Sequence, residues 1–160
     1  MLMPAVVAVA IEPPEQPEVV ALLAQLDSYL CALYPPESTY ILEVASLRGP
    51  EIRFFVARRD AVPVGCGALR LEEEGYGEVK RMFVDPTARG LGIGKRLLLA
   101  IEAEARRLGL HTLRLETGIY QAEALGLYAA LGYREIRAFG DYPADAPYSR
   151  FLAKRLGAAD

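Results

Sequence analysis

One stretch of the chain decides the fold: Arg89-Gly90-Leu91-Gly92-Ile93-Gly94-Lys95. It lies between an apolar segment with strand character, residues 79–84, and a segment with leucines at helical spacing, residues 97–108. A glycine-rich turn that opens a helix leaves several backbone N–H groups without an intrahelical partner, and the helix dipole adds partial positive charge there. Because glycine has no Cβ, an anion can approach the main chain closely. The stretch therefore predicts a site for a phosphate-bearing ligand.

The spacing of the glycines excludes two common phosphate-binding loops. The stretch is not G-x-x-x-x-G-K-[ST], because no Ser or Thr follows Lys95 and the glycines stand too close together. It is not the dinucleotide fingerprint G-x-G-x-x-G either, since the three glycines give G-x-G-x-G. The pattern that fits is R-G-x-G-[IV]-G preceded by V-x-P, which here is Val84-Asp85-Pro86.

This pattern resembles the acetyl-CoA-binding motif of the GNAT superfamily of N-acetyltransferases. The resemblance covers most of the chain, is strongest over residues 62–154, and points to a small single-domain bacterial member. It implies transfer of an acetyl group from acetyl-CoA to a primary amine of a small molecule or peptide by direct attack. It also implies that the cofactor binds along Met82, Phe83 and Val84 and along residues 89–95.

The composition limits the remaining function classes. The chain has 160 residues, 52% of them hydrophobic, which suits one folded domain over residues 1–160. Its net charge of -3 argues against broad binding of nucleic acid or of a membrane surface, because both usually need a basic excess. Two cysteines and a single histidine make neither a disulfide framework nor a metal or triad constellation, so no metal is expected. Residues 1–11 lack a basic leader and a cleavage site, so we expect a first strand and a cytoplasmic protein.

Hydrophobic periodicity and turn residues predict a mixed α/β chain. Strands are expected at residues 1–11, 51–58, 62–71, 78–84, 111–116, 133–138 and 149–154. Helices are expected at residues 17–33, 37–47, 97–108 and 121–131. This order leads three antiparallel strands into one βαβ crossover. It matches the GNAT fold, which implies a mixed central sheet of about seven strands flanked by about four helices.

The implied reaction needs a proton acceptor for the attacking amine, whose pKa is about 10.4 if it is lysine-like, and a proton donor for the leaving thiolate. Glu78 is the candidate base, because many family members place a glutamate at this point of the strand before the loop, and burial would make it a better acceptor. Tyr128 is the candidate acid, because residues 124–133 resemble A-x-x-L-Y-x-x-x-G-[FY], whose tyrosine faces the thioester sulfur. The alternatives are a solvated glutamate at a strand end and a tyrosine that anchors a helix.

Two further cofactor contacts are expected from the resemblance. Gln121 stands seven residues before Tyr128, where the family usually has an Asn that bonds the pantetheine arm or the phosphates. The main chain of residues 82–84 would pair with the pantetheine amides if this strand splays from its neighbour. Ordinary ladder pairing in a buried strand is the alternative.

The acceptor is the least defined part of the predicted site. Carboxylates and aromatic rings in the loop 139–148 would receive a cationic amine, and the run 115–118 at the end of the strand 111–116 would help to position it. Turn chemistry and the end of a strand explain the same residues. The predicted acceptor residues are Tyr34, Glu43, Glu116, Thr117 and Tyr142.

Two rival functions would use the same residues differently. A non-catalytic acyl-CoA-binding or sensing domain would need the glycine loop but neither Glu78 nor Tyr128. An interaction module in which the glycine turn is only structural would bind no coenzyme A. Family members often pair, so a homodimer is compatible with the chain.

Overall fold

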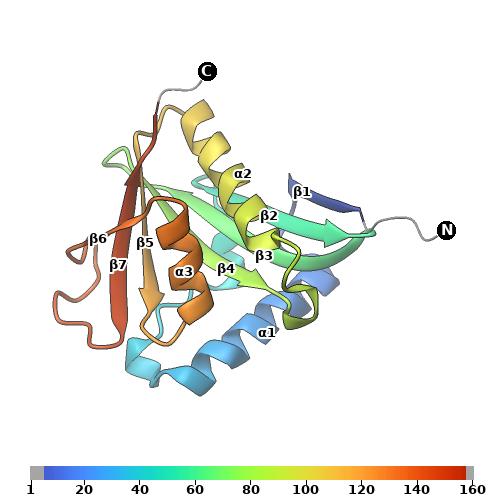
Figure 1. Ribbon diagram of the computed structural model, residues 1–160, viewed down its shortest axis with the longest axis horizontal. Helices are drawn as coiled ribbons and strands as arrows, with labels where there is room; N and C mark the ends of the chain where they lie inside the picture. Colours follow the sequence, from blue (N-terminus) through green and yellow to red (C-terminus); the bar gives the residue numbers. More distant parts are fainter. Residues whose placement is uncertain (1–5, 158–160) are drawn as a thin grey trace.

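The computed structural model describes residues 6–157, which build a seven-stranded mixed sheet with helices on both faces (Figure 1). The strands are β1 (Val7–Ile11), β2 (Ile52–Arg59), β3 (Val62–Leu71), β4 (Gly77–Val84), β5 (Thr112–Gly118), β6 (Arg134–Ile136) and β7 (Ser149–Arg155). The α-helices are α1 (Pro17–Leu33), α2 (Ile93–Arg107) and α3 (Ala122–Ala130). The 3-10 helices are η1 (Pro36–Ser38), η2 (Val44–Arg48) and η3 (Pro86–Ala88).

The strand order is β1-β2-β3-β4-β5-β7-β6, in which β4 and β5 are parallel and every other pair is antiparallel. The predicted fold class and the predicted β4-α2-β5 crossover are therefore confirmed. The expected closing pair of strands is confirmed, because β6 and β7 are antiparallel neighbours. The later strand β7 lies between β5 and β6, so β6 forms the sheet edge.

Both faces of the sheet are buried, and β2 shows how the sequence achieves this. Phe54 and Val56 pack in the same hydrophobic cluster as α1, whereas Phe55 and Ala57 pack in the cluster that contains α2. This is the two-residue alternation of a strand, with apolar residues at both phases. Burying each large apolar side chain contributes about 1.5–3 kcal/mol. The helices on both faces therefore fix the position of the central strands, including β4.

The parallel neighbours β4 and β5 separate before they end. The last pair in their register joins Val79 to Leu115. Over residues 80–84 of β4 and 116–118 of β5, all of which the structure describes, no further pair joins the two strands. Figure 1 shows the two strands diverging toward their carboxyl ends. The expectation that this strand splays from its neighbour is confirmed.

A β-bulge in β4 accompanies the separation. Lys80 pairs with Ala68 and Phe83 with Cys66, so two residues of β4 face the single residue between them on β3. One of the two, Arg81, has a φ of +59°. A bulge bends the strand that carries it and increases its local twist. The bulge thus turns the end of β4 away from β5 and opens a fork in the sheet.

The predicted helix over residues 37–47 is wrong. This segment holds η1 and η2 with irregular chain between them, so the described residues contain three α-helices rather than about four. Neither short helix has a side-chain hydrogen bond at its N-cap. Between them, the Thr39 N–H donates back to Pro36 and the Glu43 carbonyl accepts from Ser46, which are bonds of the two short helices and not of a continuous α-helix. A short segment without caps does not sustain an α-helix.

Several element bounds also differ from the predictions. Helix α2 begins at Ile93, four residues earlier than expected, so the end of the glycine loop forms its first turn. Strand β6 covers only Arg134–Ile136 of the predicted residues 133–138. The first predicted strand is described as Val7–Ile11, and residues 1–5 lie outside the described part of the chain. No helix within residues 6–157 has both the length and the apolarity needed to cross a bilayer.

Candidate active site

The glycine loop carries the chain from β4 into α2, and its glycines serve two different purposes. Gly90 and Gly92 have φ values of +83° and +71°, and a Cβ at either would meet nothing within 4 Å. Glycine is needed there for the left-handed backbone and not for close packing. At Gly94 a Cβ would come within 3.1 Å of Leu127 Cδ2. That glycine lets α2 and α3 approach each other.

An open groove of about 450 Å³, here called the glycine-loop groove, lies between this loop, the end of β4 and α3. The predicted cofactor residues that line it are Met82, Phe83, Val84, Arg89, Gly90, Gly92, Ile93, Gly94, Lys95, Gln121 and Tyr128. Leu91 does not line it, and its side chain is exposed. The groove therefore collects an exposed helix N-terminus and two basic residues, which together favour an anionic ligand.

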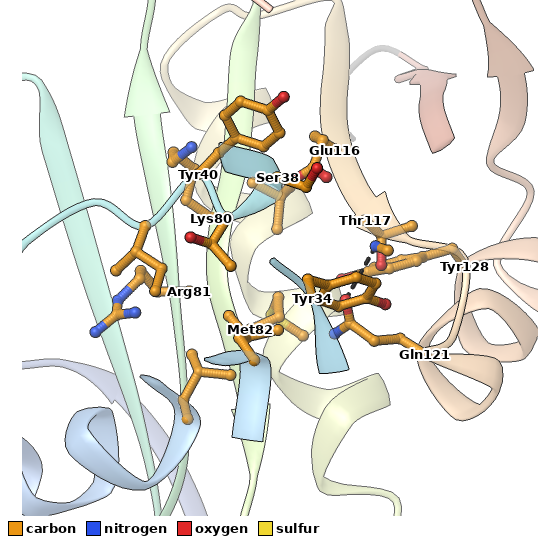
Figure 2. Close-up of a pocket in the computed structure, with 16 residues that line it drawn as sticks. Tyr34, Ser38, Tyr40, Lys80, Arg81, Met82, Glu116, Thr117, Gln121 and Tyr128 are labelled. Atoms are coloured by element: carbon orange, nitrogen blue, oxygen red, sulfur yellow. Dashed lines mark hydrogen bonds between the residues drawn. The ribbon is translucent and has the colours of Figure 1, made fainter. Parts of the chain in front are cut away.

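A second cavity of about 80 Å³, here called the inner cavity, lies in the fork between β4 and β5 (Figure 2). Its walls come from α1, from residues 38–41, from residues 79–82 of β4 and from residues 116–118 of β5. Met82, Gln121 and Tyr128 line both the inner cavity and the glycine-loop groove. The two spaces therefore adjoin at these three side chains, which we call the junction.

The bulge also shapes the junction. A Cβ on Gly67 of β3 would come within 2.5 Å of Met82 Sδ. The glycine thus makes room for a side chain that the bulge would otherwise drive into β3. Met82 is held at the junction, and its backbone has no partner on β5 within the described strands.

Tyr128 lies at the junction with its ring buried and its hydroxyl unused. Only 5% of the residue is exposed, and its ring packs against Tyr133 at a centroid distance of 5.7 Å. Among the described residues no protein atom accepts or donates a hydrogen bond at its hydroxyl. Burial, with a smaller effect of the Glu116 charge, raises the pKa of the Tyr128 hydroxyl. It therefore stays protonated near neutral pH and can donate a hydrogen bond at the junction.

The predicted base Glu78 is buried but does not line the inner cavity. Its Oε2 accepts a hydrogen bond from the Tyr142 hydroxyl and lies 3.5 Å from Lys80 Nζ. Lys80 Nζ in turn donates to the Tyr142 hydroxyl over 2.8 Å. Burial and the charge of Glu78 raise the pKa of that hydroxyl, so it remains a donor. Glu78 therefore lies behind the cavity wall, and its neighbour Lys80 connects it to the cavity.

Glu116 is the carboxyl that lines the inner cavity. Ser149 Oγ donates a hydrogen bond to its Oε2 over 2.7 Å. Burial raises the pKa of the Glu116 carboxyl, against the opposing effect of the Ser149 hydrogen bond. A carboxyl with a raised pKa in a cavity is typical of an acid–base group. The sequence placed Glu116 only among acceptor-binding residues, because its position in the fork depends on where the β4–β5 pairing stops.

The other predicted residues divide between the two spaces. Gln121 Oε1 accepts a hydrogen bond from the Gly118 N–H over 2.9 Å, which leaves its NH2 group to donate at the junction. Tyr34 lines the inner cavity with Thr117, and its hydroxyl accepts the Tyr120 N–H over 3.1 Å. Its ring stacks on Tyr120, which lines the glycine-loop groove, so this pair forms part of the partition.

Two predicted acceptor residues, Glu43 and Tyr142, line neither the inner cavity nor the glycine-loop groove. Tyr142 contacts the site through its hydrogen bonds with Glu78 and Lys80, whereas Glu43 is exposed and precedes η2. Tyr40, from the same segment as Glu43, lines the inner cavity, and its ring packs edge-on against Tyr142 at 5.2 Å.

Known proteins resemble this chain over almost its whole length. Residues 19–133 match the model of the Acetyltransferase (GNAT) family. The chain is 53% identical to an IAA acetyltransferase of Azospirillum brasilense over 151 residues, which cover 94% of this chain and 98% of the relative.

Solved structures share the same architecture. A Klebsiella pneumoniae protein described as an acyl-CoA N-acyltransferase has a TM-score of 0.81 at 39% identity, over 94% of this chain and 98% of that one. The PaiA N-acetyltransferase of Thermoplasma acidophilum, solved in complex with coenzyme A, has a TM-score of 0.72 at 16% identity, over 94% and 99% of the two chains.

Proposed function

Because the chain belongs to the GNAT family of acetyltransferases and is an acyltransferase, we propose that it transfers an acetyl group from acetyl-CoA to a primary amine of a small molecule or peptide. One observation carries the proposal. The glycine-loop groove and the inner cavity adjoin at Met82, Gln121 and Tyr128, so a donor in one and an acceptor in the other would meet there.

The glycine-loop groove suits coenzyme A. Its diphosphate would lie at the N-terminus of α2, where free N–H groups, Arg89 and Lys95 provide positive charge. Arg89 forms an exposed ion pair with Glu123 at 3.2 Å, which solvent weakens. The main chain of residues 82–84, which the fork leaves without a β5 partner, would pair with the two pantetheine amides. Acetyl-CoA itself supplies the activated thioester.

The residues around the junction have distinct roles in the proposed transfer. Glu116 takes a proton from the acceptor amine, directly or through a water, because it is the carboxyl that lines the inner cavity. The backbone N–H of Met82 or Phe83 stabilises the negative charge that develops on the carbonyl oxygen. Tyr128 donates its hydroxyl hydrogen to the leaving thiolate, whose pKa as a free thiol is about 8.5.

Glu78 is the alternative base, since it was expected from the family resemblance and is buried nearby. In that role it would have to act through Tyr142, which already donates a hydrogen bond to it. A general base needs hydrogen-bond reach to the proton that it removes, directly or through one water. Glu116 meets this requirement with fewer intermediary groups. Replacing each glutamate by glutamine distinguishes the two candidate bases.

A thiol-release screen tests the proposed function. Purified protein is incubated with acetyl-CoA and a panel of primary amines, and free coenzyme A is measured over time. We expect release that depends on the amine and on enzyme concentration, and that Tyr128→Phe slows. Binding of coenzyme A by calorimetry without release for any amine would instead support the non-catalytic sensing domain. The absence of both would refute the proposed function.

A further inference from the structure

The fork in the sheet places two opposite charges side by side. Because Val79 and Leu115 form the last β4–β5 pair, Lys80 and Glu116 are the first residues beyond it on the two strands. Both line the inner cavity. Figure 2 shows them at the same end of the cavity, beside Tyr40 and away from Met82.

Lys80 is held in place by a network that leaves part of its hydrogen-bonding capacity free. Its ammonium has three N–H donors, of which one goes to the Tyr142 hydroxyl at 2.8 Å and one faces Glu78 at 3.5 Å. The Tyr142 hydroxyl donates its own hydrogen to Glu78 and accepts from Lys80, so the network is complete without Glu116. With 12% of its side chain exposed, Lys80 still reaches the cavity that it lines.

Glu116 is left for another partner. Within residues 6–157, no Lys, Arg or His nitrogen lies within 4.0 Å of its carboxylate, and its hydrogen bond comes from Ser149. The inner cavity therefore presents a carboxyl and an ammonium that are neighbours but are not paired with each other. A buried charge is stabilised when an opposite charge lies against it.

We propose that the acceptor is a small amino acid or a close analogue, with its amine against Glu116 and its carboxylate against Lys80. This inference rests on the proposed function, because it names the acceptor of that same transfer. The cavity of about 80 Å³ favours a compact acceptor. Each end of such a zwitterion would find a charge-assisted hydrogen bond, and Lys80 would use its third donor. In this arrangement Glu78 does not contact the acceptor, and it positions Lys80 through their ion pair.

A plain amine or a polyamine fits the same charges less well. It would satisfy Glu116 but would bring a second cation toward Lys80 or leave its third donor unused. Arg81 does not offer a second carboxylate site, because its guanidinium points away from Glu116 and Thr117 in Figure 2 and pairs with Asp27. Its remaining Nε and Nη2 are fully buried. The anionic end of the acceptor is therefore assigned to Lys80.

Matched acceptors test the proposal. We would measure kcat/KM for glycine and glycinamide, and for alanine and alaninamide, with the wild type, Lys80→Met and Lys80→Arg. Lys154→Met is the control, because it removes another partly buried lysine that pairs with Glu102 and lines neither cavity. The amide is less basic than the amino acid for every variant, so the readout is the change in the acid-to-amide ratio between wild type and variant.

Loss of the charged partner is expected to lower that ratio about 10- to 100-fold in Lys80→Met, with the preference largely kept in Lys80→Arg and Lys154→Met. Lys80→Gln replaces Lys80→Met if the latter does not fold by circular dichroism. An unchanged ratio in a folded Lys80 variant, or a wild type that acetylates plain amines better, would overturn the inference and leave the proposed function standing. No transfer to any amine would overturn both.

Discussion

Replacing Glu116 by Gln tests the chemistry at the junction most sharply. Gln keeps the size of the side chain and an oxygen that can still accept the Ser149 hydroxyl, which donates over 2.7 Å. Since that bond survives and Glu116 forms no ion pair within the described residues, we expect the free energy of unfolding to change by less than about 1 kcal/mol. The ability to take a proton is lost together with the negative charge that faces the acceptor ammonium. At saturating acceptor, kcat reports the lost base and should fall about 10²- to 10⁴-fold near neutral pH.

The pH dependence gives the same experiment a second readout. Burial raises the pKa of Glu116 above its ordinary value of 4.5. Below the raised pKa the wild type carries a protonated Glu116 and lacks its base, whereas above it the carboxylate is available. The ratio of wild-type to Glu116→Gln activity should therefore be near one at low pH and rise to a plateau as pH increases. The titration of the amine is common to both proteins and cancels in the ratio.

Thiol release at saturating acetyl-CoA, followed from about pH 5 to pH 9, measures this ratio. Glu78→Gln is the matched control, because its amide oxygen can still accept the Tyr142 hydroxyl. We expect Glu78→Gln to change kcat less than Glu116→Gln and to keep the wild-type pH profile. A Glu116→Gln enzyme within about threefold of wild type, together with a Glu78→Gln enzyme that loses the pH dependence, would assign the base to Glu78 instead.

Three further changes have defined outcomes. Tyr128→Phe should lower kcat about 10²-fold with little change in the Kd for coenzyme A and no loss of stability, because the hydroxyl bonds no described protein atom; a kcat near wild type would contradict this. Gly92→Asp and Gly92→Asn both place a side chain at a φ of +71°, which costs about 1–2 kcal/mol in each variant. Because only Asp adds negative charge, calorimetry should show coenzyme A binding at least about tenfold weaker for Asp than for Asn. Ile101→Ala, at a fully buried position, should lower the free energy of unfolding by about 2–5 kcal/mol in urea titrations, and a smaller loss would mean that the core collapses around the cavity.

Local patterns predicted most strands and helices and the glycine loop, and the family resemblance added their arrangement in one mixed sheet. Gly90 and Gly92 signal a left-handed turn that only glycine adopts easily, and the apolar strand before them and the leucine face after them fix a strand–loop–helix unit. The predicted helix over residues 37–47 was wrong for a local reason as well. It contains apolar residues at roughly helical spacing but lacks caps, and spacing alone does not report on capping.

The roles of the two glutamates depend on long-range structure that a single sequence does not reveal. Glu78 is covered because Tyr142, 64 residues later, returns to donate a hydrogen bond to it. Glu116 lines the inner cavity because the β4–β5 pairing stops one position earlier, at Leu115. Both glutamates look alike as charged residues in strands. Register and loop closure, which are set by tertiary packing, decide which one faces the acceptor.

A crystal structure of the chain with acetyl-CoA bound tests the central claim, that donor and acceptor meet at the fork between β4 and β5, most directly. The account predicts the diphosphate against residues 89–95, the pantetheine along residues 82–84, and the thioester sulfur within hydrogen-bond distance of the Tyr128 hydroxyl. A ligand that lies elsewhere, or whose acetyl group points away from Met82 and Glu116, would contradict it.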